Sequence, residues 1–249
     1  MLRASVTLSA LAAAYVAYFH ASAVNSYFFI EFGAPEANAR SLDVTASIAL
    51  VFAGVLVLIP RLRVAPVLGS LFVAIWFFCL ALSDTALDGR AFSSLSLPAA
   101  ALRICVPIAL SLALIGRHNW WPKLLQVAVA VTFATHGYEA LCHNPKFVDL
   151  ILLNLNPGAL EGTPLLSEGA AVILLTCIGV MDVACALFVL LIRKPALVLY
   201  MACWGGITAL SRMGALGLEA WPEAILRASH FGAPLALFLI WRRRDIMRP

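Results

Sequence analysis

The chain has 249 residues, of which 63% are hydrophobic and only 12% are charged. A soluble domain carries about a quarter charged residues, so this composition excludes an ordinary soluble protein and indicates a bilayer protein. The formal net charge of +4 is too small to indicate nucleic-acid binding. We therefore expect the lipid bilayer to be the main partner.

Eight apolar stretches follow one another along the chain. Each is close to the roughly 20 residues that a helix needs to cross the hydrocarbon core of a membrane. The sequence therefore predicts an all-α integral membrane protein with about eight transmembrane helices. In chain order the expected spans are residues 5–31, 42–60, 64–83, 98–116, 123–143, 168–192, 195–217 and 222–242.

The first stretch has a second interpretation. Arg3, the apolar run after it and the small residues Ala21-Ser22-Ala23 resemble a signal peptide with its cleavage site. Apolar residues continue beyond that point, through Tyr27 to Ile30, and cleavage would leave an odd number of spans. We therefore expect this stretch to be retained as a span.

The basic residues at the span edges predict the orientation. The connections on one side hold only Arg40, Arg90 and Lys146, together with acids such as Asp43. Short cytoplasmic connections retain Lys and Arg during insertion, so both termini are expected in the cytoplasm. This is the pattern of a multi-pass protein of the cell membrane, most naturally a bacterial inner membrane. Eleven of the 17 basic residues then lie on the cytoplasmic side: Arg3, Arg61, Arg63, Arg117, Lys123, Arg193, Lys194, Arg242, Arg243, Arg244 and Arg248.

The two halves of the chain resemble each other. Trp76 matches Trp204 at an offset of 128, and Pro107 in the fourth span matches Pro234 in the eighth at an offset of 127. These ordered matches predict two tandem four-helix repeats that cross the bilayer in the same direction, because each repeat has an even number of spans. The predicted repeats are residues 1–118 and residues 119–249.

Most ionisable residues inside the spans are expected in the half of the bilayer that faces away from the cytoplasm, with only Asp182 near the centre. Depth follows from the helical rise of 1.5 Å per residue. An ionisable group in lipid costs about 2.5–3.5 kcal/mol on insertion scales, so several at one depth are expected to face a shared polar cavity. The expected lining is His20, Arg103, His136, Glu139, His143, Arg212, Arg227 and His230.

The densest part of this set is the run from His136 through Glu139 to His143, because positions i, i+3 and i+7 share one helix face. We expect His136, Glu139 and Asp182 to handle protons, which makes them the candidate catalytic residues. Arginine has a planar fork that suits carboxylates, phosphates and sulfur oxyanions. The candidate ligand-binding residues are His20, Arg103, His143, Arg212, Arg227 and His230.

Two other interpretations of these residues stay open. His136 and His143 are about 10.5 Å apart along the helix axis, which is too far to share one ion easily. Haem or a metal would therefore need ligands from another helix, and no metal site is predicted. In the structural interpretation, Glu139 pairs with a histidine or with Arg227 and holds the helices together.

Residues 146–156 alternate apolar and polar side chains. This pattern is typical of a short amphipathic helix that lies on the membrane surface, where it would cover the predicted cavity.

The element Thr135-His136-Gly137 within a span resembles DoxX-like membrane proteins, which are four-span bundles with a His-Gly element in the first helix. The resemblance is clearest over residues 123–242. The first half, 5–116, is similar to a degraded second copy in which Ala21 follows His20. The resemblance implies a four-helix bundle with these pocket residues: His136, Glu139, Arg212, Arg227 and His230.

Some DoxX-like proteins are subunits linked to quinone-dependent sulfur oxidation and to membrane redox complexes. The resemblance therefore implies a redox-associated membrane subunit with partner subunits, which binds a quinone or a small anionic ligand. The alternative is a non-enzymatic assembly component, or a carrier for a small molecule or lipid. A third hypothesis is a membrane-embedded cyclase or transferase that uses Glu139 and Asp182 as acid and base.

Overall fold

The computed structural model describes residues 1–59, 64–89, 91–156 and 165–246. Every regular element in this part of the chain is a helix, which confirms the predicted all-α class. Six of these helices are long and apolar enough to cross a membrane, and the bent pair of α11 and α12 is a seventh candidate. The protein is therefore a multi-pass membrane protein by the length and composition of its helices.

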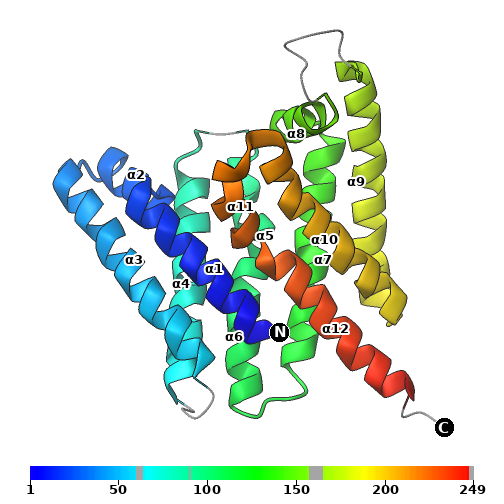
Figure 1. Ribbon diagram of the computed structural model, residues 1–249, viewed down its shortest axis with the longest axis horizontal. Helices are drawn as coiled ribbons and strands as arrows, with labels where there is room; N and C mark the ends of the chain where they lie inside the picture. Colours follow the sequence, from blue (N-terminus) through cyan, green and yellow to red (C-terminus); the bar gives the residue numbers. More distant parts are fainter. Residues whose placement is uncertain (60–63, 90, 157–164, 247–249) are drawn as a thin grey trace.

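The long helices run in alternating directions (Figure 1). They are α1 (Leu2–Phe19), α3 (Glu36–Leu58), α4 (Val64–Ala86), α6 (Ala101–Leu114), α7 (Trp121–Leu141), α9 (Glu168–Leu191), α10 (Pro195–Leu216) and α12 (Ala228–Ile246). The shorter elements are α2 (Ala23–Ile30), η1 (Ser93–Leu95), α5 (Ser96–Ala99), α8 (Pro145–Leu155), η2 (Leu218–Ala220) and α11 (Trp221–Leu226).

The predicted amphipathic segment forms α8, which packs against α9 and α10 at one end of the molecule. The ends of α4, α7 and α10 lie at this end, whereas α3, α6 and α9 finish at the opposite end (Figure 1). Arg3 also lies at the opposite end, because its Nη1 donates a hydrogen bond of 2.6 Å to the carbonyl oxygen of Val57.

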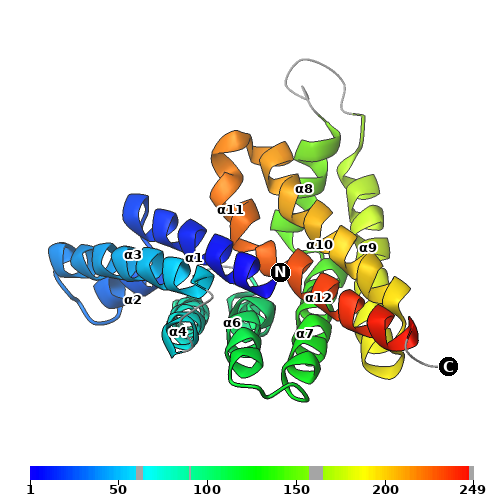
Figure 2. The same cartoon turned by 60° about the horizontal axis from the view of Figure 1, so that its bottom comes forward.

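The two halves of the chain share one apolar core. Its fully buried side chains include Leu50 and Phe77 from the first half and Leu125, Met201 and Leu237 from the second. The halves meet where α6 packs against α7 and where α1 packs against α11 and α12. The contact between α1 and α12 is visible near the N-terminus in Figure 2.

The predicted first span, 5–31, is wrong as a single helix. It divides into α1 and α2, and the break has a physical cause in α3. The Asp43 carboxylate accepts a 2.9 Å hydrogen bond from the Ser22 backbone N–H and a 2.5 Å bond from the Ser22 hydroxyl. The Ser22 hydroxyl in turn accepts from the Asn25 N–H and caps α2. These bonds replace the helical ones that a continuous span would make.

The prediction that Arg40 and Asp43 belong to a loop is also wrong, because α3 already begins at Glu36. The last carbonyl groups of a helix have no partner within it. Arg40 provides that partner for α1, by donating to the carbonyl oxygens of Ala17 and Tyr18. Arg40 and Asp43 therefore hold the broken first segment against α3.

The other span predictions differ in detail from the structure. The fourth is preceded by η1 and α5, and together they form one candidate span, Ser93–Leu114. The eighth bends by 45° between α11 and α12. The fifth corresponds to α7, which is not among the six candidates because Gln126, Thr132, His136 and Glu139 make it less apolar. Of the basic residues used for orientation, Arg61, Arg63, Arg90 and Arg248 lie outside the described residues.

Candidate functional site

Two adjoining cavities lie at the end of the molecule that carries α8. The inner chamber has a volume of about 180 Å³ and lies between α7, α8, α9, α10 and α12. The vestibule has a volume of about 580 Å³ and extends toward α4, α5 and α6. The two share part of their walls, and therefore form one site with two compartments. The shared residues are His136, Phe147, Leu150, Arg212 and Arg227.

The inner chamber is mainly apolar, whereas the vestibule is rich in charge. Phe133, Leu175, Ile178 and Trp204 line the chamber. The vestibule is lined by four basic and four acidic residues, whose formal charges cancel. Which ligand charge it favours therefore depends on how these groups are paired and not on their net charge. They are Arg103, Lys146, Arg212, Arg227, Asp84, Glu139, Asp149 and Glu223.

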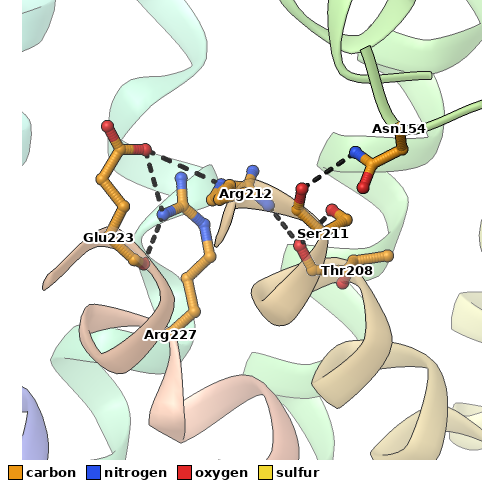
Figure 3. A network of polar contacts seen from close by, with 6 residues as sticks. All are labelled: Asn154, Thr208, Ser211, Arg212, Glu223 and Arg227. Carbon is orange, nitrogen blue, oxygen red and sulfur yellow. Dashed lines mark hydrogen bonds and ion pairs between the residues drawn. The ribbon is translucent and has the colours of Figure 1, made fainter. Parts of the chain in front are cut away.

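Arginines from three parts of the chain meet in the vestibule. Arg103 lies in the first turn of α6, Arg212 near the end of α10, and Arg227 at the break between α11 and α12. Their positive charges lie close enough together to repel one another. The half-exposed carboxylate of Glu223 lies between two of them, with Oε2 3.9 Å from Arg212 Nε and 3.9 Å from Arg227 Nη1 (Figure 3). These distances exceed that of a hydrogen bond, so both ion pairs are weak.

Among the described residues, most of the guanidinium donors in this cluster have no hydrogen-bond acceptor. Each guanidinium group has five N–H donors. Arg227 Nη1 donates a 2.7 Å bond to the Glu223 carbonyl oxygen, and Arg212 Nη1 donates to the carbonyl oxygen of Thr208 (Figure 3). The buried Nε of Arg103 has no hydrogen-bond partner among the described residues. The cluster can therefore donate to a further acceptor.

Helix α8 is fixed beside the arginines. The Asn154 side chain donates a 2.8 Å bond to the Ser211 carbonyl oxygen on α10 (Figure 3). It also donates a 2.7 Å bond to the Leu150 carbonyl oxygen. At the other end of α8, the Asn144 side chain accepts from the Lys146 N–H. These anchors place Phe147 and Leu150 in the wall between chamber and vestibule.

The Glu139 carboxylate is buried and has a partner for each oxygen. Oε2 lies 2.8 Å from His136 Nδ1, and Oε1 accepts a 3.3 Å bond from the Asn144 side chain. Glu139 therefore orients the His136 ring and joins the end of α7 to the start of α8. This geometry is the histidine pairing that the structural interpretation expected.

The His136 ring stacks on the ring of His230, with centroids 5.8 Å apart and an interplanar angle of 29°. The backbone of α12 at His230 lies close to α10. Only a glycine fits at position 205 of α10, because a Cβ there would lie 2.5 Å from the His230 carbonyl oxygen. Both imidazoles line the inner chamber. The site therefore combines a guanidinium cluster, a histidine pair and an apolar compartment.

Two candidate ligand-binding residues lie outside both cavities. His20 is exposed at the end of α1, where its ring is 6.2 Å from that of Tyr15. His143 does not share the face of His136 and Glu139, because α7 ends at Leu141 and His143 adopts a left-handed φ of 53°. Its Nε2 is instead 3.0 Å from the Thr176 hydroxyl on α9. Of the candidate residues, the structure brings together Arg103, His136, Glu139, Asp182, Arg212, Arg227 and His230.

The structural interpretation also expected Glu223 to neutralise arginines of the cluster, and Glu223 does lie beside Arg212 and Arg227. Sequence reasoning missed three residues of the site: Asn144, Phe147 and Trp204. Asn144 carries a readable signal, since Asn before Pro is typical of a helix start. Trp204 carries none, because an aromatic residue in an apolar helix is most often core.

Among the described residues, no group of three or more His, Cys, Asp or Glu side chains is arranged to hold a metal ion. Comparison of the chain with family models, with curated proteins and with solved structures finds no match. The functional argument therefore depends on the geometry of the two compartments.

Proposed function

We propose that this multi-pass membrane protein binds a small, partly apolar anion, with the charged group in the vestibule and the apolar body in the inner chamber. The observation that carries the proposal is the convergence of Arg103, Arg212 and Arg227 beside an apolar compartment, with most of their donors unused among the described residues. Ligand sites commonly combine apolar walls with a few polar groups that fix the orientation.

The arginine cluster favours an anion over a neutral quinone. Like charges held close together repel, and only an opposite charge removes that repulsion while accepting the unused hydrogen bonds. A carboxylate, phosphate or sulfur oxyanion does both, whereas a quinone carbonyl supplies an acceptor without charge. The redox association and the partner subunits implied by the DoxX-like resemblance stay predictions.

We also propose the finer topology. Counting α7 and the bent pair α11–α12 with the six candidate helices gives eight spans, arranged as two tandem repeats, 1–118 and 119–249, of which the second is DoxX-like. Basic residues near the ends of α6 and α9, and Arg3 beside the end of α3, support cytoplasmic termini. The vestibule then opens on the non-cytoplasmic face of the cell membrane, in a bacterium the inner membrane.

Replacing arginines of the vestibule with glutamine is expected to weaken binding of a small aromatic carboxylate. We use cinnamate as the probe, measured by calorimetry on purified protein in detergent. Hydrogen bonds to charged groups contribute about 1.5–3 kcal/mol, so Arg103→Gln and Arg227→Gln are each expected to weaken cinnamate about 10–100-fold.

Arg242→Gln is the matched control for this experiment. Arg242 is exposed over the Phe238 ring, at 5.9 Å, and lines neither cavity. Its substitution is expected to leave affinity unchanged. Cinnamamide, which lacks the charge, is expected to bind the unsubstituted protein weakly. If cinnamate and cinnamamide bind equally well, or if all three variants bind alike, the anion site is refuted.

A further inference from the structure

Two residues that line the inner chamber each have a buried polar atom with no hydrogen-bond partner among the described residues. The Asp182 side chain on α9 is 7% exposed, and its Oδ1 has no hydrogen-bond partner among the described residues. The same holds in this part of the chain for Nδ1 of His230, which is 6% exposed. Both residues line the chamber. Buried polar groups are nearly always hydrogen-bonded, so these two atoms indicate that the chamber's occupant bonds to them.

The occupant can donate a hydrogen bond to Asp182 in either protonation state of the carboxyl group. An ionised carboxylate only accepts, and a protonated one keeps an accepting carbonyl oxygen. The Trp204 indole interacts with this carboxyl group and can donate only once. The apolar wall residues Phe133, Leu175 and Ile178 have no donor, and the Thr208 and Ser211 hydroxyls donate to backbone carbonyl oxygens of α10.

The donor is better a hydroxyl than an ammonium group. Arg212 and Arg227 line the same chamber, so they would repel a cationic ligand group. A hydroxyl carries no charge, and it both donates and accepts. It can therefore donate to Asp182 and also accept from His230 Nδ1 in the tautomer that carries a proton on that nitrogen.

The distance between the two ends of the site sets the length of the ligand. Trp204 lies eight residues before Arg212 on α10, which is about 12 Å along the axis at 1.5 Å per residue. The Arg212 side chain turns back toward the chamber, because it bonds the carbonyl oxygen of Thr208 one turn earlier. The anion and the hydroxyl are therefore separated by somewhat less than this distance.

The walls between these ends favour a flat body. Phe133, Phe147 and Trp204 supply aromatic surfaces, and the stacked His136 and His230 rings supply a further one. Aromatic groups pack on one another in offset or edge-to-face arrangements that add about 0.5–1.5 kcal/mol beyond the burial of area.

From these observations we propose that the ligand is a hydroxyaryl carboxylate, or an oxyanion of the same shape, whose hydroxyl group donates a hydrogen bond to Asp182. The proposal depends on the anion site proposed above and adds the chemistry of the opposite end. Asp182 and Trp204 are then residues that determine specificity, whereas the arginines provide the affinity for charge.

The matched probes are 4-hydroxycinnamate and cinnamate, which differ only in the hydroxyl, with affinities measured by calorimetry at pH 7. A hydrogen bond to the buried Asp182 carboxyl group predicts that the unsubstituted protein prefers 4-hydroxycinnamate by about tenfold. In Asp182→Leu the two affinities are expected to become equal, while cinnamate still binds. Asp182→Asn keeps one acceptor oxygen, and is expected to retain part of the preference.

Asp88→Asn is the control, because it removes the charge of an exposed carboxylate that lines neither cavity, and its preference is expected to match that of the unsubstituted protein. Equal affinities in the unsubstituted protein, or an undiminished preference in Asp182→Leu, overturn the hydroxyl assignment and leave the anion site standing. Failure of both acids to bind overturns this inference together with the proposed function.

Discussion

Replacing Gly205 with alanine is expected to destabilise the protein by about 1–3 kcal/mol, the usual range for overpacking a filled interior. The added Cβ would lie 2.5 Å from the carbonyl oxygen and 2.9 Å from the carbonyl carbon of His230. Both are backbone atoms, so no side-chain rotation relieves the clash and α12 must move away from α10. His230 moves with it, and the stacking on His136 and the affinity for cinnamate are expected to fall as well.

Gly206→Ala is the control for this prediction. A Cβ at Gly206 would meet only the Phe231 side chain, at an ordinary 3.6 Å. Alanine also favours a helix over glycine by about 1 kcal/mol, so this variant is expected to be as stable as the unsubstituted protein or more so. The measurement is the midpoint of thermal unfolding in one detergent. Equal midpoints for the two variants would contradict the close approach of the helices.

The sequence predicts the membrane class well because the bilayer restricts the possible structures so strongly. Without water in the hydrocarbon core, a spanning segment must hydrogen-bond its own backbone N–H and C=O groups. Within a single segment, only a helix does this, and its side chains must be mainly apolar. The helices α4, α9 and α10 follow their predicted ranges within a few residues. The amphipathic pattern of α8 is equally readable, since its apolar side chains pack with Ala171 and Leu175 of α9.

Breaks in the helices depend on distant residues and are therefore invisible to hydropathy. The run around Ser22 is apolar enough to continue a helix, and only Asp43, 21 residues further on, takes its backbone N–H. The prediction for His143 failed for the same reason. The i+7 pattern assumes that the helix continues to His143, whereas α7 ends at Leu141. A helix that faces a polar cavity, as α7 does, also loses the apolar signal that identifies a span.

Much of the candidate site could be inferred from the free-energy cost of placing charged groups in a membrane. Arg103 is far from Arg212 and Arg227 in the sequence, yet each lies where its helix reaches the end of the molecule that carries α8, and topology then brings them together. The pairing within the cluster could not be read in this way. Whether Glu139 joins an arginine or His136 depends on ångström-scale geometry, as does the lack of a protein partner for Oδ1 of Asp182 among the described residues.

Asp43→Asn is expected to destabilise the protein by about 1–3 kcal/mol, because it weakens two charge-assisted hydrogen bonds in a fully buried position. The asparagine amide retains one acceptor oxygen, so one of the two Ser22 donors faces an NH₂ group. The junction of α1 and α2 then loses its attachment to α3, while Arg40 still holds the end of α1. The thermal unfolding midpoint is expected to fall, and protease cleavage near residues 20–22 to become faster.

Asp88→Asn tests whether burial causes this effect. Asp88 also accepts a side-chain hydrogen bond, 2.8 Å from the Ser93 hydroxyl, but it is exposed to solvent. Its positive φ of 44° is a conformation that asparagine tolerates. Water replaces the bond that the substitution weakens. The free energy of unfolding of this variant is therefore expected to lie within about 0.5 kcal/mol of that of the unsubstituted protein. Equal losses in the two variants would show that the Asp43 contact does not hold the broken helix, and that the break arises from the apolar packing of α1 and α2 alone.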